Sequence, residues 1–242
     1  GDDGQIALAN DETLHALEFY KTLADASPDG NLFWQQSREL YLDGRAAMII
    51  WSPFILDELA GLRDSVPVTI SDDPTSSELA GLTGIVTTLA GPDNPDGAGW
   101  AASSNWGITV DADTENAQAF VEWVLDGDGY LQWLSLAPEG LFPARSGTMA
   151  NPTGFIEGWS NLDVGVDRRA PLAELYGQEV VDDIVAGLSV ANRWAFSQGE
   201  GALLSRLYGT RVMAELVRAY LDGEATAEET VELLQTRISA LR

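Results

Sequence analysis

The sequence has no cysteine, and it contains a single histidine (His15) and a single lysine (Lys21) in 242 residues. Without cysteine, disulfides, cysteine-bound zinc, iron–sulfur clusters and thiol catalysis are excluded, and one histidine excludes multi-histidine metal sites. Basic residues are few, with 13 Lys and Arg against 38 Asp and Glu and a formal net charge of −25 at pH 7. Such a surface repels phosphate groups, so we expect no nucleic acid partner. We expect no metal and no cofactor either.

Long hydrophobic runs are also missing. The longest fully apolar run, Ala46–Trp51, is far shorter than the ~20 residues that a membrane span needs. Residues Gly1–Gly4 have neither the basic start nor the apolar core of a signal peptide. We therefore expect no signal peptide within this sequence, and we interpret the chain as part of a longer protein.

The composition is nevertheless that of a folded protein. Hydrophobic residues make up 45% of the chain, which contains 8 Trp, 7 Phe and 6 Tyr, whereas disordered acidic segments are poor in such residues. High acidity with almost no lysine is typical of proteins that stay soluble in concentrated salt, where screening limits the repulsion between carboxylates. We interpret the charge as a halophilic adaptation rather than as a functional signal.

Apolar spacing and capping residues predict a helix-dominated α/β protein. The first expected helices run from Asn10 or Asp11 to about Ala24, from about Trp34 to Leu42, and from Ser52–Pro53. The next run from Asp113 to near Asp126–Gly127 and through Leu131 and Leu134. One or two helices are expected over Pro171–Leu188, one long helix over Ala202–Leu221, and a last one after Thr226. Short apolar runs predict strands at Ala46–Trp51, Val66–Ile70 and Trp106–Val110. The Gly- and Pro-rich stretch 71–105 is expected to form loops with some extended structure.

Adjacent acids raise the possibility of an enzyme. A glycosidase needs two carboxyl groups facing each other roughly 5–9.5 Å apart. Pairs such as Asp72–Asp73 and Asp182–Asp183 also arise by composition alone in a chain with 38 acids, so solvated surface is the favoured interpretation. A carboxylate-based glycoside hydrolase stays as the alternative function.

The tryptophans favour ligand binding rather than catalysis. Trp51 closes one predicted strand before Ser52–Pro53, and Trp106 opens another after Ser103–Asn105. Indole rings beside polar loops can hold carbohydrate, because the C–H face of a sugar stacks on the ring while its hydroxyls bind polar groups around the rim. The alternative is that these tryptophans pack the core.

Four stretches carry a resemblance to a known family. They are Leu40–Met48 (Leu-Tyr-Leu-Asp-Gly-Arg-Ala-Ala-Met), Trp106–Val110 with Asn116–Val124, Gly140–Arg145 (Gly-Leu-Phe-Pro-Ala-Arg) and Gly223–Glu229 (Gly-Glu-Ala-Thr-Ala-Glu-Glu). In this order they resemble the family 1 extracellular solute-binding proteins of ABC importers, the maltose-binding-protein-like group. The likeness covers little more than the C-terminal half of a typical member.

The resemblance implies a fold and a site. The fold would be that of the class II periplasmic binding proteins, an α/β fold of two lobes with most of the N-terminal lobe missing. Residues 1–99 and 188–242 would belong to the C-terminal lobe, and residues 100–187 to the hinge and the other lobe. The implied ligand-binding residues are Trp51, Ser52, Phe54, Asn105, Trp106, Arg145, Arg193 and Trp194. Arg145 could equally be an ion-pair partner in so acidic a chain.

We therefore expect a non-enzymatic binding protein for a sugar or oligosaccharide. Its partner would be an ABC permease, and it would be extracellular and associated with the membrane through that transporter. A degenerate fragment with a role in assembly is a further alternative, which predicts exposed apolar patches or an oligomer that buries them. The sequence does not identify the ligand.

Overall fold

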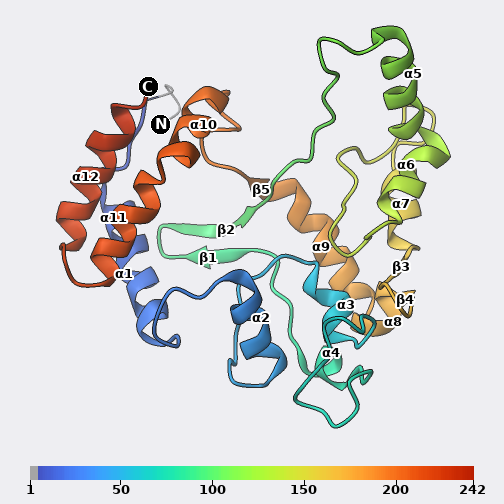
Figure 1. The fold of residues 1–242 in the computed structure, drawn as a ribbon, viewed down its shortest axis with the longest axis horizontal. Helices are drawn as coiled ribbons and strands as arrows, with labels where there is room; N and C mark the ends of the chain where they lie inside the picture. Colours follow the sequence, from blue (N-terminus) through green and yellow to red (C-terminus); the bar gives the residue numbers. More distant parts are fainter. Residues whose placement is uncertain (1–4) are drawn as a thin grey trace. The chain divides into compact units, whose positions relative to one another are not determined.

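The computed structural model describes residues 5–242, so the expectation for Gly1–Gly4 lies outside the described residues. The described chain is a helix-rich α/β structure with small sheets (Figure 1). Its elements are α1 Asp11–Asp25, α2 Trp34–Leu42, α3 Ile55–Leu59, α4 Glu78–Leu82, β1 Leu89–Gly91, β2 Asn94–Trp100, α5 Thr114–Val124, α6 Gly127–Leu134, α7 Gly154–Ser160, β3 Asp163–Val164, β4 Ala170–Pro171, α8 Leu172–Tyr176, α9 Gln178–Val190, β5 Ala191–Asn192, α10 Gly201–Thr210, α11 Val212–Leu221 and α12 Ala227–Ser239.

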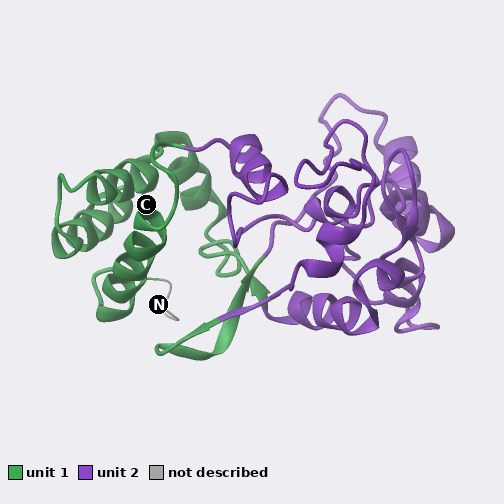
Figure 2. Cartoon of the chain, turned by 90° about the horizontal axis from the view of Figure 1, so that it is seen from below, with its two compact units in different colours: residues 1–31, 90–100, 191–242 green, residues 32–89, 101–190 purple. Residues whose placement is uncertain are grey.

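The chain divides into two compact units (Figure 2). Unit 1 contains the residues up to Asn31, Ala90–Trp100 and Ala191–Arg242, and unit 2 contains Leu32–Leu89 and Ala101–Val190. The chain therefore passes between the units four times, after Asn31, Leu89, Trp100 and Val190. The assignment of segments to two lobes of a binding protein stays a prediction.

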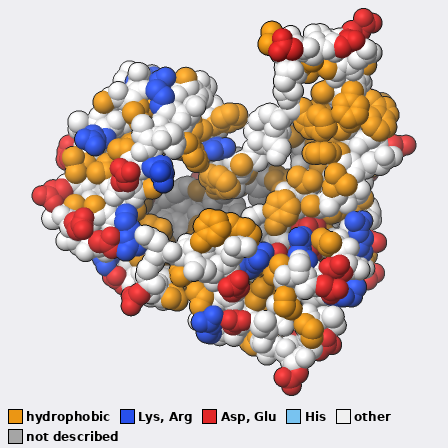
Figure 3. Space-filling model, in the orientation of Figure 1, with side chains coloured by type: hydrophobic (Ala, Val, Ile, Leu, Met, Phe, Trp, Pro, Cys, Tyr) orange, Lys and Arg blue, Asp and Glu red, His pale blue; other side chains and the backbone are white. Residues whose placement is uncertain are grey.

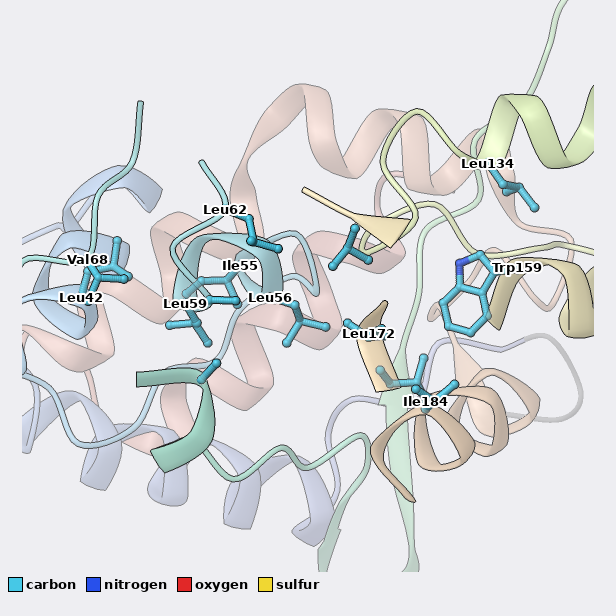
Figure 4. Packing of buried hydrophobic residues seen from close by; sticks show 14 of the residues in the cluster. Leu42, Ile55, Leu56, Leu59, Leu62, Val68, Leu134, Trp159, Leu172 and Ile184 are labelled. Atoms are coloured by element: carbon cyan, nitrogen blue, oxygen red, sulfur yellow. The ribbon is translucent and has the colours of Figure 1, made fainter. Parts of the chain in front are cut away.

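Unit 2 is built around α3, whose five residues are all buried. Its core joins α3 to α6, α7, α8 and α9, and Figure 4 shows side chains from these elements pointing toward one another. The most completely buried large side chains here include Leu59, Leu134, Val164 and Val181. Burial of a short helix on every side favours apolar residues, and α3 also contains Asp57 and Glu58, whose carboxylates accept hydrogen bonds from Arg63 and Arg38.

Unit 1 is a packing of α1, α10, α11 and α12 around a separate core. Leu203 and Leu207 are one helical turn apart on α10, and Val231, Leu234 and Ile238 form one face of α12. Residues at such spacing lie on the same side of a helix, so each helix presents an apolar stripe to its neighbours. Ile238 is fully buried at 0% exposure, which makes it the centre of this core.

The sheets are small. β2 lies between β1 and β5, and it pairs with β5 in parallel, with Gly99 opposite Ala191 and Trp100 opposite Asn192. β3 and β4 form an antiparallel pair in unit 2, with Val164 opposite Ala170. The strands of the larger sheet thus lie next to three of the four points where the chain passes between the units.

The helices expected from caps at Asn10 or Asp11 and at Asp113 are confirmed. Asn10 Oδ1 accepts a hydrogen bond from the Thr13 amide at 2.8 Å, and Asp113 Oδ1 accepts one from the Asn116 amide at 3.2 Å. α2 begins at Trp34 and ends at Leu42 as expected, and the region 171–188 forms two helices. Side-chain acceptors at an N-cap satisfy amides that have no partner inside the helix, and this local rule needs no tertiary information.

The three expected strands are wrong. Residues 46–51, 66–70 and 106–110 lie outside strands in the structure. Met48 and Val110 are 81% and 96% exposed, so the first and third runs are not buried strands, whereas Val68 in the second run is buried at 1% exposure without forming a strand. A strand needs a partner for its backbone groups, and an apolar run alone does not supply one.

Two helices also differ from expectation. The segment 202–221 forms two helices, α10 and α11, because Arg211 adopts a left-handed conformation with φ of 55° between them. α3 begins at Ile55, later than the expected start at Ser52–Pro53. A single left-handed residue interrupts the hydrogen bonds of a helix, and apolar spacing does not reveal it.

The capping box at the start of α12 allows the contribution of a single cap to stability to be measured. Thr226 Oγ1 accepts from the Glu229 amide at 3.2 Å, and Glu229 Oε2 accepts from the Thr226 amide at 2.9 Å. Replacing Thr226 with alanine should lower the free energy of unfolding by about 1 kcal/mol, because one amide loses its acceptor. Urea denaturation would measure the change, and Thr226→Ser should stay close to wild type. Equal losses in both variants would contradict a role of the hydroxyl.

Among residues 5–242, no helix combines the length and the apolar composition that crossing a membrane requires.

Candidate functional site

The first candidate surface is an aromatic group formed by Phe33, Trp34 and Trp51, here called the Trp51 group. Ring centroids are 5.6 Å apart for Phe33 and Trp34 and 6.1 Å apart for Trp34 and Trp51. Phe33 and Trp34 are 59% and 47% exposed, whereas Trp51 is partly buried and packs against the core of unit 2. The Arg38 guanidinium lies over the Trp34 ring at 5.0 Å, an arrangement in which a cation is attracted to the ring face.

Ser52 and Phe54 follow Trp51 and have mainly local partners. Ser52 Oγ accepts a hydrogen bond from the Phe54 amide at 3.4 Å. The Phe54 ring lies so close to Gly140 that a Cβ at this glycine would be 2.3 Å from the ring. Gly140 therefore allows Phe54 to cover the turn after α6, and 40% of Phe54 stays exposed.

The second candidate surface is a row of four aromatic rings, here called the Trp106 group. Trp106 is 4.9 Å from Trp133 and 5.9 Å from Phe120, and Phe120 is 6.2 Å from Trp123, measured between ring centroids. Phe120 and Trp123 lie three residues apart on α5, so they share one helix face. Figure 3 shows hydrophobic side chains gathered where α5 and α6 lie in Figure 1.

Exposure differs along the Trp106 group. Trp123 is 62% exposed, Phe120 52% and Trp106 38%, whereas Trp133 packs partly against the core of unit 2. Trp133 thus fixes the inner end of the row, and the other three rings offer their faces or edges to solvent. The neighbouring Asn105 is exposed, and its side-chain amide donates to the Ser103 carbonyl at 3.3 Å.

Arg145 is exposed, and its partners are aromatic rings and a backbone carbonyl of unit 2. Its guanidinium lies over the rings of Tyr130 and Phe155, at 5.6 and 5.2 Å, and it donates to the Leu125 carbonyl. The Tyr130 hydroxyl in turn accepts from the Ala144 amide at 2.7 Å. Arg145 therefore forms no ion pair in the described structure and holds the turn after α6 against an aromatic pair.

Arg193 and Trp194 lie in unit 1. The Arg193 guanidinium is 5.9 Å from the Trp100 ring and 5.3 Å from the Tyr208 ring. Trp194 is 42% exposed and Trp100 is 71% exposed. This third aromatic surface resembles the Trp51 group, since an arginine again lies over an exposed indole ring.

The structure therefore distributes the predicted residues over separate surfaces. Unit 1 contains two of them, Arg193 and Trp194. Unit 2 contains the other six, which are Trp51, Ser52, Phe54, Asn105, Trp106 and Arg145. Among residues 5–242, no ring contact joins the Trp51 group to the Trp106 group. The ligand-binding role of these residues stays a prediction.

Sequence reasoning missed part of both aromatic groups. Phe33, Trp34 and Phe120 were not singled out as candidates, and Phe120 is 52% exposed. The adjacent pair Phe33–Trp34 and the Phe120–Trp123 pair at helical spacing were signals in the sequence. Neither signal states whether a ring faces the core or solvent, because that depends on what packs against the helix.

Acidic residues line one surface hollow of about 370 Å³ in unit 2. Glu157 and Asp182 lie at its rim, with Val181 and Val185 among its apolar residues. Each acid accepts a hydrogen bond from a residue four positions away, Glu157 from Thr153 and Asp182 from Gln178. Such local pairing is typical of surface helices. In the described part of the chain, no group of three or more His, Asp or Glu side chains is arranged to hold a metal ion.

The comparisons with known proteins give one informative match. The chain is similar to the Escherichia coli (strain K12) protein named "Putative ABC transporter periplasmic-binding protein YcjN", with 21% identity over 244 residues. The alignment covers 99% of this chain and 49% of that protein, so the chain spans about half the length of the curated relative it matches. No family model and no solved structure matches. This similarity supports a general relationship to the solute-binding proteins of ABC transporters.

Proposed function

We propose that the protein is a solute-binding component of an ABC import system and that its ligand is a sugar or oligosaccharide. The similarity to a periplasmic-binding protein supports the transport role and a location outside the cytoplasmic membrane. The proposed partners are the ligand and an ABC permease, to which the liganded protein delivers its cargo. A binding role also means that no bond of the ligand is broken.

The observation that carries the carbohydrate proposal is the Trp106 group. Its neighbouring rings are 4.9 to 6.2 Å apart and three of the four are at least 38% exposed. Sugar rings present C–H faces that stack on aromatic rings, and their hydroxyls bind amides such as that of Asn105. A row of rings fits a ligand of several sugar units better than a single sugar, because successive units can lie on successive rings.

Titration with short linear oligosaccharides tests the proposal. Isothermal titration with maltotriose and cellotriose should detect binding, and Trp106→Ala should weaken it about tenfold, the equivalent of about 1.4 kcal/mol of lost ring contact. Trp123→Ala should weaken it less, because that ring lies at the end of the row. The matched control is Phe19→Ala, an exposed aromatic residue of α1 outside the three aromatic surfaces.

Two results would contradict the proposal. If neither sugar binds, the carbohydrate assignment loses its support. If Trp106→Ala and Phe19→Ala bind a sugar equally well, the ligand site lies elsewhere on the chain. Circular dichroism of each variant separates a lost contact from a lost fold.

The assembly role is favoured by a different observation. Many large apolar side chains of the described residues are strongly exposed, among them Met48 at 81%, Ile50 at 76%, Leu82 at 77% and Val86 at 74%. Soluble monomers seldom expose apolar residues in large contiguous patches, and such patches are typical of protein–protein interfaces. Light scattering on the sample used for titration would show whether the binding species is the 26.0 kDa monomer or an oligomer.

A further inference from the structure

Three carboxylates are buried in unit 2, and none of the three belongs to the surfaces described above. Asp57 and Glu58 on α3 are 0% and 4% exposed, and Glu139 in the turn after α6 is 1% exposed. Arg38 from α2 and Arg63 from the segment after α3 lie against them. We call these five residues the buried acid cluster. Acidic side chains are almost never fully buried unless each has its own partner, so this cluster needs an explanation.

One arginine is shared among all three carboxylates. Arg63 donates from Nε and Nη2 to Asp57 Oδ2, at 3.0 and 2.9 Å. The same guanidinium is 3.9 Å from Glu58 Oε1 and 3.6 Å from Glu139 Oε1, both beyond normal hydrogen-bond length. Arg38 gives Glu58 a second partner, with Nη1 donating to Oε1 at 2.8 Å.

The charges in the cluster do not balance when all three acids are ionised. Three carboxylates face two guanidinium groups, which leaves one negative charge in excess. Each carboxylate also has one buried oxygen without a hydrogen-bond partner among the described residues, namely Asp57 Oδ1, Glu58 Oε2 and Glu139 Oε2. An excess buried charge is strongly unfavourable, and binding of one proton removes it.

Glu139 is the acid with the weakest compensation. Asp57 receives two guanidinium hydrogen bonds and Glu58 receives one, whereas the nearest cationic nitrogen of Glu139 is 3.6 Å away. Burial is the main cause that raises the pKa of Glu139, and the charge of Asp57 raises it further, whereas backbone hydrogen bonds and the charge of Arg63 lower it. A proton in the cluster is therefore held best on Glu139.

The groups around the cluster do not supply the missing charge. The Tyr176 hydroxyl of α8 donates to the Leu56 carbonyl at 2.6 Å and stays neutral, since burial raises its pKa. Tyr41 of α2 pairs with Thr83 instead. The next cation, Arg168, binds the Gly61 carbonyl and Asp64.

We infer that the buried acid cluster is a proton-binding site in which Glu139 is the protonated residue, and that the fold of unit 2 is most stable with this proton bound. The site lies where α2, α3 and the turn after α6 meet, so it connects three separate segments of unit 2. Loss of the proton would leave an uncompensated charge at that junction.

The raised pKa values of the buried acids determine how the stability of unit 2 changes with pH. Burial raises the pKa of Glu139, and it raises the pKa of Asp57 and of Glu58 as well. The folded state then binds more protons than the unfolded state between the ordinary glutamic acid pKa of about 4.3 and the raised value. Stability is therefore present at acidic pH and is lost as pH rises through that window.

The test compares three proteins by urea unfolding from about pH 4 to 9 in about 1 M salt, where the Debye length of about 3 Å suppresses repulsion between surface acids. In the wild type, the folding equilibrium constant should fall with rising pH, by up to tenfold per unit for one proton, about 1.4 kcal/mol. Glu139→Gln should lose most of this slope and be the more stable protein at the alkaline end. The control Glu122→Gln removes an exposed acid of α5 and should keep the wild-type slope.

A Glu139→Gln protein whose curve runs parallel to the wild type overturns the inference, because the residue would then have only a structural role. Infrared spectroscopy of the folded wild type gives a second readout that needs no variant. A protonated carboxyl band should persist to a higher pH than the ordinary glutamic acid pKa of about 4.3 at which exposed acids lose their protons. Disappearance of this band together with those of the exposed acids also overturns the inference, even if Glu139→Gln does not fold.

Discussion

Replacing Trp159 with alanine is expected to lower the free energy of unfolding of unit 2 by about 3–5 kcal/mol, the usual range for a buried tryptophan. The side chain is 2% exposed, and its ring contacts Phe142 edge-to-face at 5.2 Å. Its Nε1 donates a buried hydrogen bond of 2.9 Å to the Pro138 carbonyl. The substitution therefore leaves a large cavity and an acceptor without a partner.

Two further variants divide this loss into its parts. Trp159→Phe keeps most of the ring but removes the donor, so it should cost about 1–3 kcal/mol. Trp123→Ala removes an indole ring that is 62% exposed and should change stability by less than about 1 kcal/mol. Urea denaturation followed by circular dichroism would measure all three. A similar effect of Trp159→Ala and Trp123→Ala would mean that the described core of unit 2 is incorrect.

Replacing Arg63 with alanine is expected to cost about 3–5 kcal/mol at neutral pH, because it strands buried carboxylates without their shared cation. Asp57 would lose both of its guanidinium hydrogen bonds, and Glu139 would lose its nearest positive charge. The loss should be smaller at about pH 4.5, where the stranded acids take up protons more readily. Unfolding curves at the two pH values would measure the difference.

A double variant and a control substitution test whether the effect of Arg63→Ala arises from the buried charges. The double variant Arg63→Ala with Asp57→Asn should recover part of the lost stability, because it removes the charge that loses both of its guanidinium hydrogen bonds. Arg169→Ala, which removes an exposed arginine of the same unit, should stay within about 0.5 kcal/mol of wild type. If the Arg63→Ala loss were equal at both pH values, the arginine would act through packing rather than through charge.

The sequence predicted those parts of the fold that depend on neighbouring residues. The caps at Asp113 and Thr226 were identified correctly, and Asn10 was one of two candidates for the first cap, because each cap and its amide are three residues apart. Strand pairing is different, since Gly99 pairs with Ala191 across more than ninety positions. The Gly- and Pro-rich composition of β2 gave no sign that it lies between two other strands.

The same limit applies to the site. Trp51 and Trp106 were identified as functional candidates from their sequence context, and both lie in partly exposed aromatic groups. Sequence context does not reveal whether an aromatic residue of a helix is buried. Trp159 is buried at 2% exposure, whereas Phe120 is 52% exposed. The three buried acids were not identified, because in a chain with 38 acidic residues the residue type alone does not distinguish a buried acid from an exposed one. Burial is decided by segments far away in the sequence.

The order of folding during synthesis follows from the way in which unit 1 is assembled. The Leu8 amide donates to Gln235 Oε1 at 2.7 Å, and Gln235 Nε2 donates to the Ile6 carbonyl at 2.9 Å, across 227 and 229 residues. All of unit 2 lies between these partners in the sequence. A ribosome must therefore release the residues of unit 2 before α1 can meet α12, and until then α1 exposes its apolar face. Unit 2 can acquire its core earlier, and the closure of such a long loop would slow the completion of unit 1.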